Sequence, residues 1–237
     1  MDDRYLARTA AATRTLEIDE GLRSYMLSVY NYMALGLALT GLTAYVTASS
    51  PALLGVIFGT PLQWVVMLAP LGFVFFLGAR IHRMSVSTAQ LVFWAFAVVM
   101  GLSMASIFLV FTYTSIARVF FISAATFGAM SLYGYTTRRD LTSWGTFLFM
   151  GLIGLIVASL VNLFVQSSAF HFAISLVGVV VFVGLTAYDT QRIKEEYYEF
   201  DSPETSARKA ILGALMLYLD FINLFIMLLR LFGQSRD

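Results

Sequence analysis

The sequence predicts an all-α membrane protein, a bundle of seven transmembrane helices with the last helix at its centre. Hydrophobic residues make up 59% of its 237 residues and charged residues only 12%, whereas soluble domains average about 45–50% and ~25%. The charges are clustered and leave long uncharged tracts between them. A helix needs about 20 apolar residues to cross a bilayer core of ~30 Å, and the tracts are long enough for one or two such crossings. Apolar and polar residues do not alternate in them, as the strands of a membrane β-barrel would require.

Turn-forming residues divide the longest tracts into pairs of helices. Ser49–Pro51 and Gly59–Pro61 interrupt the first tract, Thr112–Ser115 the second and Gln166–Ser168 the third. A tail, 1–23, precedes a seven-helix domain, 24–237. The expected spans are 25–48, 62–79, 89–111, 116–135, 144–165, 170–190 and 210–232.

Lysine and arginine predict the orientation, because short cytoplasmic loops carry an excess of both. Twelve of the 15 fall in the tail and in every second loop, which makes the N-terminus cytoplasmic and, after seven crossings, the C-terminus external. Arg230 and Arg236 leave one alternative open, a last segment that re-enters without crossing. The twelve are Arg4, Arg8, Arg14, Arg23, Arg80, Arg83, Arg138, Arg139, Arg192, Lys194, Arg208 and Lys209.

Composition also excludes several classes of function. A net charge of +1 is too small for an electrostatic nucleic-acid binder. There is no cysteine, and the two histidines, His82 and His171, fall on opposite sides of the predicted membrane, so they cannot share a zinc ion. We therefore expect no enzyme and no cofactor.

Two aspartates stand out. Asp220 lies about 14 Å along the helix from Ile211, deep in the last span, where a carboxylate is costly unless it faces a cavity or a partner. Asn223 shares its helical face. Asp189 ends the uncharged part of the sixth span, three residues before Arg192. An interfacial charge or an Arg192 partner would also explain Asp189, and a purely structural buried carboxyl would explain Asp220.

The segments around these aspartates resemble the Bax inhibitor-1 family, also called the transmembrane BAX inhibitor motif family. The matching stretches are GLTAYDTQRI at 184–193 and ALMLYLDFINLF at 214–225, with weaker similarity at 115–117 and 126–128. The short loops and the absence of cysteine suggest a bacterial member.

The resemblance implies a pH-sensitive calcium leak of the inner membrane, gated by a carboxylate pair that carries over to Asp189 and Asp220. These two, supported by Asn223 and Arg192, would meet calcium weakly and transiently as it permeates. An arginine latch on the pair is also implied, with Arg80 the candidate and Arg83 the alternative. As an alternative function, the resemblance implies a modulator of a membrane protease or of another cell-death or stress partner, without transport.

The spacing of the two aspartates sets a condition on this site. They are separated by 31 positions, and from the predicted span ends Asp189 lies ~5 Å and Asp220 ~14 Å from the cytoplasmic edge. Direct contact therefore requires tilted helices or a seventh helix that starts before the membrane.

Small residues recur at four-residue spacing: Gly36 with Thr40, Ala124 with Gly128, and Gly154 with Ala158. Such pairs allow helix backbones to approach closely in lipid. The sequence predicts internal bundle packing at these positions, with a dimer interface as the alternative.

Overall fold

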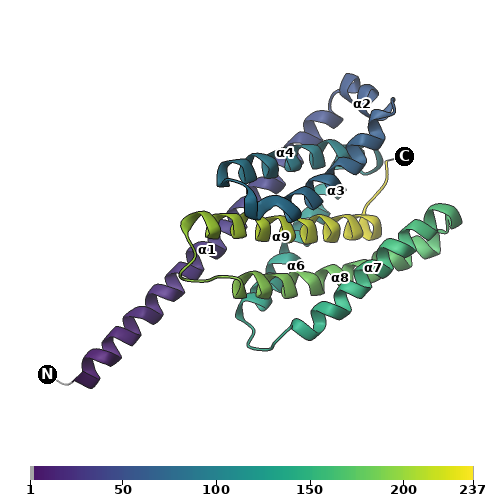
Figure 1. Cartoon of the computed structure of the whole chain (residues 1–237). Coiled ribbons are helices and arrows are strands. Elements are labelled where there is room, and N and C mark those ends of the chain that lie inside the picture. Colours follow the sequence, from purple (N-terminus) through teal and green to yellow (C-terminus); the bar gives the residue numbers. More distant parts are fainter. Residues whose placement is uncertain (1–2, 237) are drawn as a thin grey trace.

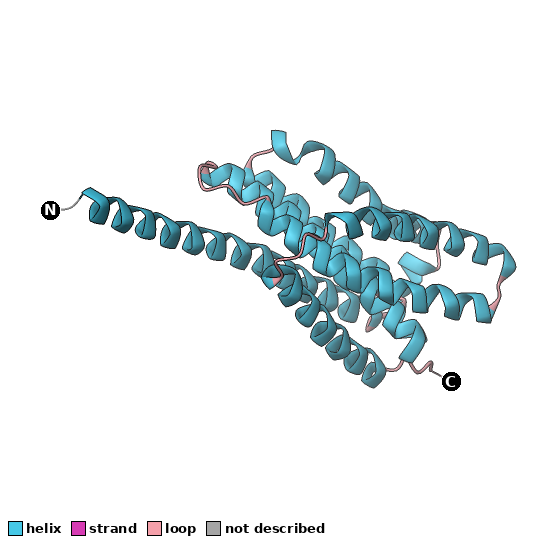
Figure 2. Ribbon diagram, turned by 90° about the horizontal axis from the view of Figure 1, so that it is seen from below, coloured by secondary structure: helices cyan, strands magenta, loops and turns pink. Residues whose placement is uncertain are grey.

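The computed structural model describes residues 3–236, and for residues 3–19 the backbone alone. Within this range the chain forms helices and no strand (Figures 1 and 2). The helices are α1 Asp3–Ala48, α2 Pro51–Phe58, α3 Leu62–Arg80, the 3-10 turn η1 Ile81–Arg83, α4 Val86–Met104, α5 Ile107–Val110, α6 Tyr113–Thr136, α7 Thr142–Val165, α8 Ser168–Glu195 and α9 Pro203–Phe232.

The predicted all-α membrane bundle is confirmed. Among the described residues, six helical segments are long and apolar enough to cross a membrane. A seventh candidate is a bent pair, the part of α1 from Glu20 to Ala48 followed by α2, which passes the same test only when the two helices, 98° apart, are taken together. The predicted third span is one segment, Val86–Val110, in which α4 and α5 are separated by a break at Ala105–Ser106.

Hydroxyl side chains fix where several helices begin. The side chains of Ser50, Ser85, Thr112, Ser167 and Ser202 each accept a hydrogen bond from the backbone N–H three residues on, at the starts of α2, α4, α6, α8 and α9. A cap of this kind satisfies one of the donors that a helix N-terminus leaves unpaired. Because Ser202 precedes a proline that suits the first helical position, α9 begins at Pro203, before the expected start of the span at 210.

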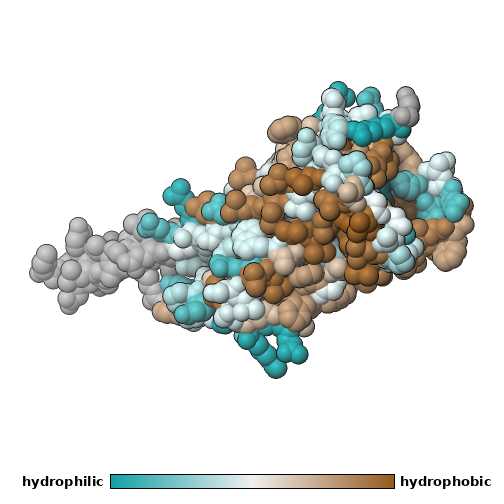
Figure 3. Space-filling model, turned by 90° about the horizontal axis from the view of Figure 1, so that it is seen from above, coloured by the Kyte–Doolittle hydropathy of each residue, from teal (hydrophilic) through white to brown (hydrophobic). Residues whose placement is uncertain are grey.

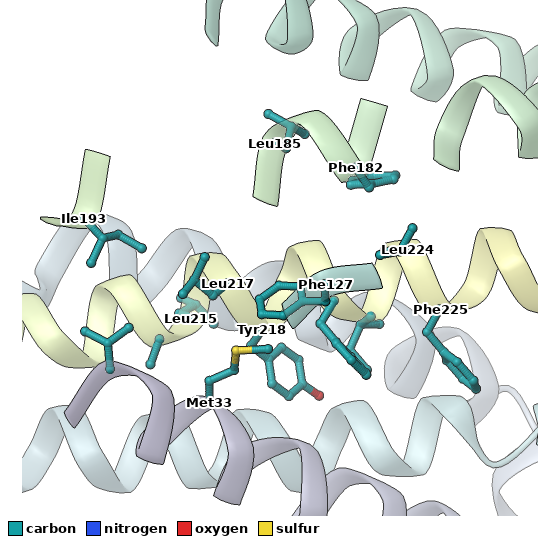
Figure 4. Packing of buried hydrophobic residues seen from close by; sticks show 14 of the residues in the cluster. Met33, Phe127, Phe182, Leu185, Ile193, Leu215, Leu217, Tyr218, Leu224 and Phe225 are labelled. Carbon is teal, nitrogen blue, oxygen red and sulfur yellow. The ribbon is translucent and has the colours of Figure 1, made fainter. Parts of the chain in front are cut away.

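The last helix is central, as predicted. In the most apolar stretch of α9, 72% of the residues are buried inside the protein, whereas in that of α7 only 11% are. It packs on α8, α1, α6 and α4, and Figure 1 shows it between the α1–α3–α4 side and the α6–α7–α8 side of the bundle. In Figure 4, side chains from three neighbouring helices meet it: Met33 of α1, Phe127 of α6 and Phe182 of α8.

Large apolar side chains cover the outside of the bundle. Phe75, Phe121, Phe147 and Phe164 are among the most exposed, and Figure 3 shows apolar residues across the middle of one face. A soluble monomer rarely exposes continuous apolar area on this scale. The lipid bilayer is the solvent that suits this surface.

Hydrogen bonds gather the basic connections at one end of the molecule, here called the basic end: the α3–α4, α6–α7 and α8–α9 connections. Arg208 at the start of α9 donates to the Met84 carbonyl at 3.1 Å, and Gln191 of α8 donates to the Arg139 carbonyl at 2.8 Å. At the opposite end, the Thr112 N–H donates to the Gln234 carbonyl at 3.0 Å. Helix α9 therefore runs from one end of the bundle to the other, which argues against a re-entrant last segment.

The prediction of internal packing is confirmed for the first small-residue pair: a Cβ atom on Gly36 of α1 would lie 3.0 Å from the Phe93 ring of α4, and Thr40 donates to the Ala97 carbonyl of α4. It is wrong at the glycines of the other two pairs. A Cβ atom built on Gly128 or Gly154 would meet no other side chain or neighbouring helix within 4 Å, so neither glycine mediates internal packing. Close approach occurs elsewhere: a Cβ on Gly134 of α6 would lie 2.2 Å from the Ala187 carbonyl oxygen of α8. Four-residue spacing alone does not reveal which face of a helix meets a partner.

The predicted tail, 1–23, is helical from Asp3 onward as part of α1. The side chains of its first 19 residues lie outside the described part of the structure. Its role as a separate cytoplasmic region stays a prediction.

Candidate ion-pathway site between the eighth and ninth helices

Asp189 and Asp220 come together because α9 begins farther out along the bundle axis than the point at which α8 ends. Six residues follow Asp189 in α8, about 9 Å of rise, whereas 17 residues of α9 precede Asp220, about 26 Å. The connection 196–202 must therefore run outward by ~17 Å before α9 turns back. Its seven residues can span about 25 Å, which is sufficient.

The two carboxyl groups lie within hydrogen-bonding reach of each other. Asp220 is only 5% exposed, and its Oδ2 atom has no hydrogen-bond partner among the described residues. Two carboxyl groups can hydrogen-bond only when one of them carries a proton, because a carboxylate accepts but cannot donate. The geometry thus suits a pair that holds one proton between its members.

A cavity of about 560 Å³ adjoins the pair. Four helices supply its walls, with Leu71 on α3, Phe149 on α7, Phe182 on α8 and Met216 on α9 as representative apolar residues. Its polar lining includes Asp189, Arg192, Asp220 and Asn223. An apolar cavity with a few convergent polar groups is the usual form of a small-ligand or ion site.

The structure brings Arg192 and Asn223 to this site. Arg192 acts electrostatically on Asp189, although its Nε donates to Glu196 at 3.2 Å. The Asn223 amide donates to the Leu219 carbonyl at 2.8 Å, which leaves its own oxygen directed away from that bond. Both side chains therefore line the same cavity as the carboxyl pair.

Arg80 lies elsewhere. It ends α3, is exposed, does not line the cavity and makes no ion pair among the described residues. The arginine latch stays a prediction that would require Arg80 to move.

Beyond Asn223 the cavity ends. There α8 and α9 pack so closely that a Cβ atom on Gly178 would lie 2.8 Å from the Met227 sulfur. Leu155 and Ile174 are buried in the same region. The cavity is therefore closed on this side of the carboxyl pair.

Sequence reasoning missed several polar residues that hold the site in place. Gln191, two residues after Asp189, accepts a hydrogen bond from the Leu141 N–H at 2.8 Å and so ties α8 to the start of α7. Thr190 and Ser131 link α8 to α6 at 3.0 Å, and Ser131 also meets the Tyr30 hydroxyl of α1. Gly145 leaves room for the ring of Tyr188, which a Cβ would approach within 2.3 Å. None of these contacts follows from a local sequence pattern.

The described residues include no cluster of three or more His, Asp or Glu side chains that could hold a metal ion. Asp189 and Asp220 alone offer fewer oxygen atoms than the six to eight that calcium prefers. A resident calcium ion would need further oxygen atoms from waters.

Comparison with known proteins connects this arrangement to a family. A family model described as "Inhibitor of apoptosis-promoting Bax1" matches residues 22–237. The chain is 51% identical to the uncharacterized protein RP147 of Rickettsia prowazekii, over 98% of this chain and 99% of that protein. It is 47% identical to the inner membrane protein YbhL of Escherichia coli K12, over 91% and 94% of the two chains, and 46% identical to an uncharacterized protein of Caulobacter vibrioides, over 99% and 98%.

The family match covers all the candidate spans and both aspartate segments. Together with the helical membrane bundle, it bears out the resemblance seen in the sequence. The chain is a member of the Bax inhibitor-1 family.

Proposed function

We propose that this chain is a pH-sensitive leak for calcium across the inner membrane, with Asp189 and Asp220 as the titrating gate. The observation that carries the proposal is the buried contact between the two carboxyl groups, beside a cavity and with one oxygen of Asp220 unpaired. A buried polar atom without a partner is costly in a purely structural role. A proton on that oxygen, or a cation that reaches it once the pair separates, would satisfy it.

Protonation sets the direction of the pH response. Two like charges cannot both form cheaply in a low-dielectric interior, so the carboxyl groups titrate as one unit. With a proton between them the pair carries one negative charge and attracts calcium weakly. Loss of that proton adds a second negative charge, favours a divalent cation and separates α8 from α9. Calcium flux should therefore rise with pH.

Weak coordination suits permeation. The two carboxylates, the Asn223 amide oxygen and waters would meet a passing calcium ion, and no tight cage would hold it there. For flux to occur, the Met227–Gly178 contact must open as the pair separates. No catalytic step and no cofactor enter this function.

The proposed orientation places the basic end in the cytoplasm, because the basic connections gather there. YbhL is named an inner membrane protein, and its similarity supports the same membrane for this chain. A single cysteine at Arg139 should react with an impermeant reagent only from the cytoplasmic side, and one at Ser50 only from outside. The reverse labelling would overturn the orientation.

The deciding experiment is calcium-dye flux in proteoliposomes that contain the purified full chain, measured across neutral and acidic pH. We expect flux above that of protein-free vesicles, rising with pH. Flux equal to that of empty vesicles at every pH would reject the leak. The modulation of a membrane protease or stress partner implied by the resemblance would then be the function to pursue.

A further inference from the structure

A second cavity lies between α1 and α6, in the half of the bundle nearer the basic end. It has a volume of about 550 Å³ and shares no described lining residue with the cavity of the carboxyl pair. Leu27 of α1 and Leu132 of α6 line it and are both more than half exposed. The cavity is therefore a groove that opens toward the lipid, here called the α1–α6 groove.

Gly128 keeps this groove open. It is one of the lining residues, and a Cβ atom built on it would meet no other side chain or neighbouring helix within 4 Å. Helices α1 and α6 both pack on α9, and a hydrogen bond of 2.6 Å between Tyr30 and Ser131 joins them directly. Protein interiors rarely leave so much space unfilled. The open glycine, which internal packing does not explain, indicates an occupant from outside the chain.

The hydroxyl groups within the groove are already satisfied. Thr190 donates to the Thr186 carbonyl at 2.7 Å, so Ser131 supplies the proton for its own contact with Thr190 at 3.0 Å. Tyr30 is then the donor to Ser131. Because these protons are engaged and Phe127 supplies an apolar wall, the depth of the groove suits a hydrocarbon chain.

Positive charge lies at the mouth of the groove. Arg23 lines it, is exposed and makes no ion pair among the described residues. It precedes Tyr30 by seven residues of α1, about 10 Å of helical rise toward the basic end. Lys194 lies over the ring of Tyr135, another lining residue, at 5.5 Å from the ring centroid. No aspartate or glutamate of the described side chains lines the groove, so its mouth favours an anion.

We infer that the α1–α6 groove binds one anionic phospholipid from the membrane leaflet at the basic end. The phosphate head group meets Arg23, and an acyl chain lies along the groove past Gly128. Basic pockets between membrane helices bind anionic head groups in this way. A soluble phosphate would leave the apolar depth empty, whereas a zwitterionic lipid would fill it but gain less from Arg23.

The test is native mass spectrometry of the full chain in detergent micelles that contain equal amounts of phosphatidylglycerol and phosphatidylethanolamine with identical acyl chains. We expect one phosphatidylglycerol molecule per chain, retained in preference to phosphatidylethanolamine. Arg23→Gln should lower that preference about fivefold, the usual contribution of one basic residue beside anionic lipid. Arg118→Gln is the matched control, because Arg118 is exposed near the opposite end of α6 and does not line the groove.

Gly128→Phe fills the groove without a change of charge. It should abolish the retention of both lipids, because the ring takes the space of the acyl chain. Gly154→Phe is the matched control, since Gly154 also faces open space but lies on α7, outside the groove. In detergent without added lipid, both variants should unfold at or above the temperature of the unmodified chain, because glycine is the weaker helix former.

Equal retention of the two lipids by the unmodified chain would overturn the inference. So would a lipid preference that Arg23→Gln leaves unchanged, or lipid retention that survives in Gly128→Phe. Displacement of the lipid by glycerol phosphate at equal concentration would identify a soluble anion as the ligand instead. Asp220→Asn should retain phosphatidylglycerol as the unmodified chain does, which separates this site from the proposed gate.

Discussion

Two buried polar side chains of α9 lie two residues apart and differ in how they are satisfied. Tyr218 is fully buried, and its hydroxyl meets Thr40 of α1 at 2.6 Å. Thr40 uses its own proton for the Ala97 carbonyl of α4 at 2.8 Å, so Tyr218 is the donor to Thr40. These two hydrogen bonds join α9, α1 and α4, and both hydroxyl protons have an acceptor. Asp220, by contrast, faces a cavity with one oxygen unpaired.

The difference separates a structural polar group from a functional one. In lipid a completed hydrogen bond between helices adds a modest stabilisation, about 0.6–2 kcal/mol. An ionisable group left partly unsatisfied lowers stability and persists where function requires it. Substitutions at Tyr218 and Asp220 should accordingly affect different measurements.

The largest effect is expected for Asp220→Asn. An amide cannot gain the second negative charge that draws in calcium, so calcium flux in proteoliposomes should lose most of its rise with pH. Tyr218→Phe, the matched control two residues away, should keep the rise. If both variants retained the pH dependence, the carboxyl pair would not be the gate.

Asp189→Asn should reproduce the loss, and the double variant with Asp220→Asn should add little to it. Groups that act as one titrating unit have non-additive effects. The comparison needs flux–pH curves for all four proteins at equal protein content. Effects of the two single substitutions that simply sum would contradict a coupled pair.

The free energy of unfolding, unlike the pH response of flux, should change when Tyr218 or its partner Thr40 is substituted. Tyr218→Phe leaves Thr40 bonded to Ala97 and should cost about 1 kcal/mol. Thr40→Val strands the Tyr218 hydroxyl without a partner and should cost about 1–3 kcal/mol. For a chain of this size each kcal/mol lowers the unfolding midpoint by about 2–4 °C. Thermal unfolding in detergent measures this, and a larger loss for Tyr218→Phe than for Thr40→Val would refute the assigned donor direction.

Charge-free tracts and turn residues predicted the long apolar helices of the bundle, because a lipid core admits few charges and requires a minimum helix length. The ends of α8 and α9 were less well predicted: both helices continue past the membrane length, α8 to Glu195 and α9 from Pro203. Ser202 followed by Pro203 was a local signal for that early start. The early start of α9 also meets the condition for contact between Asp189 and Asp220, namely a last helix that starts before the membrane.

The site was predictable only where its chemistry is unusual in lipid. Asp220 is conspicuous because a carboxylate deep in a span is costly. Gln191 and Thr190 gave no such signal, since their role depends on which backbone atoms of α7 and α6 come within reach. The same limit applies to Gly128 and Gly154, because spacing does not encode which face meets a partner.

The smallest effect is expected for Arg80→Gln, which tests the latch implied by the family resemblance. Arg80 is exposed in the present arrangement and lies outside the cavity, so flux at low pH should not change. At high pH, a latch would place its charge near the ionised pair in competition with calcium. Exposed ion pairs contribute about 1 kcal/mol or less, so removing Arg80 should raise calcium flux by about fivefold at most. Arg138→Gln is the matched control, because Arg138 is also exposed at the basic end and is not a latch candidate. An equal rise in both variants would mean that only the general surface charge at this end matters, and the latch would then have no basis at Arg80.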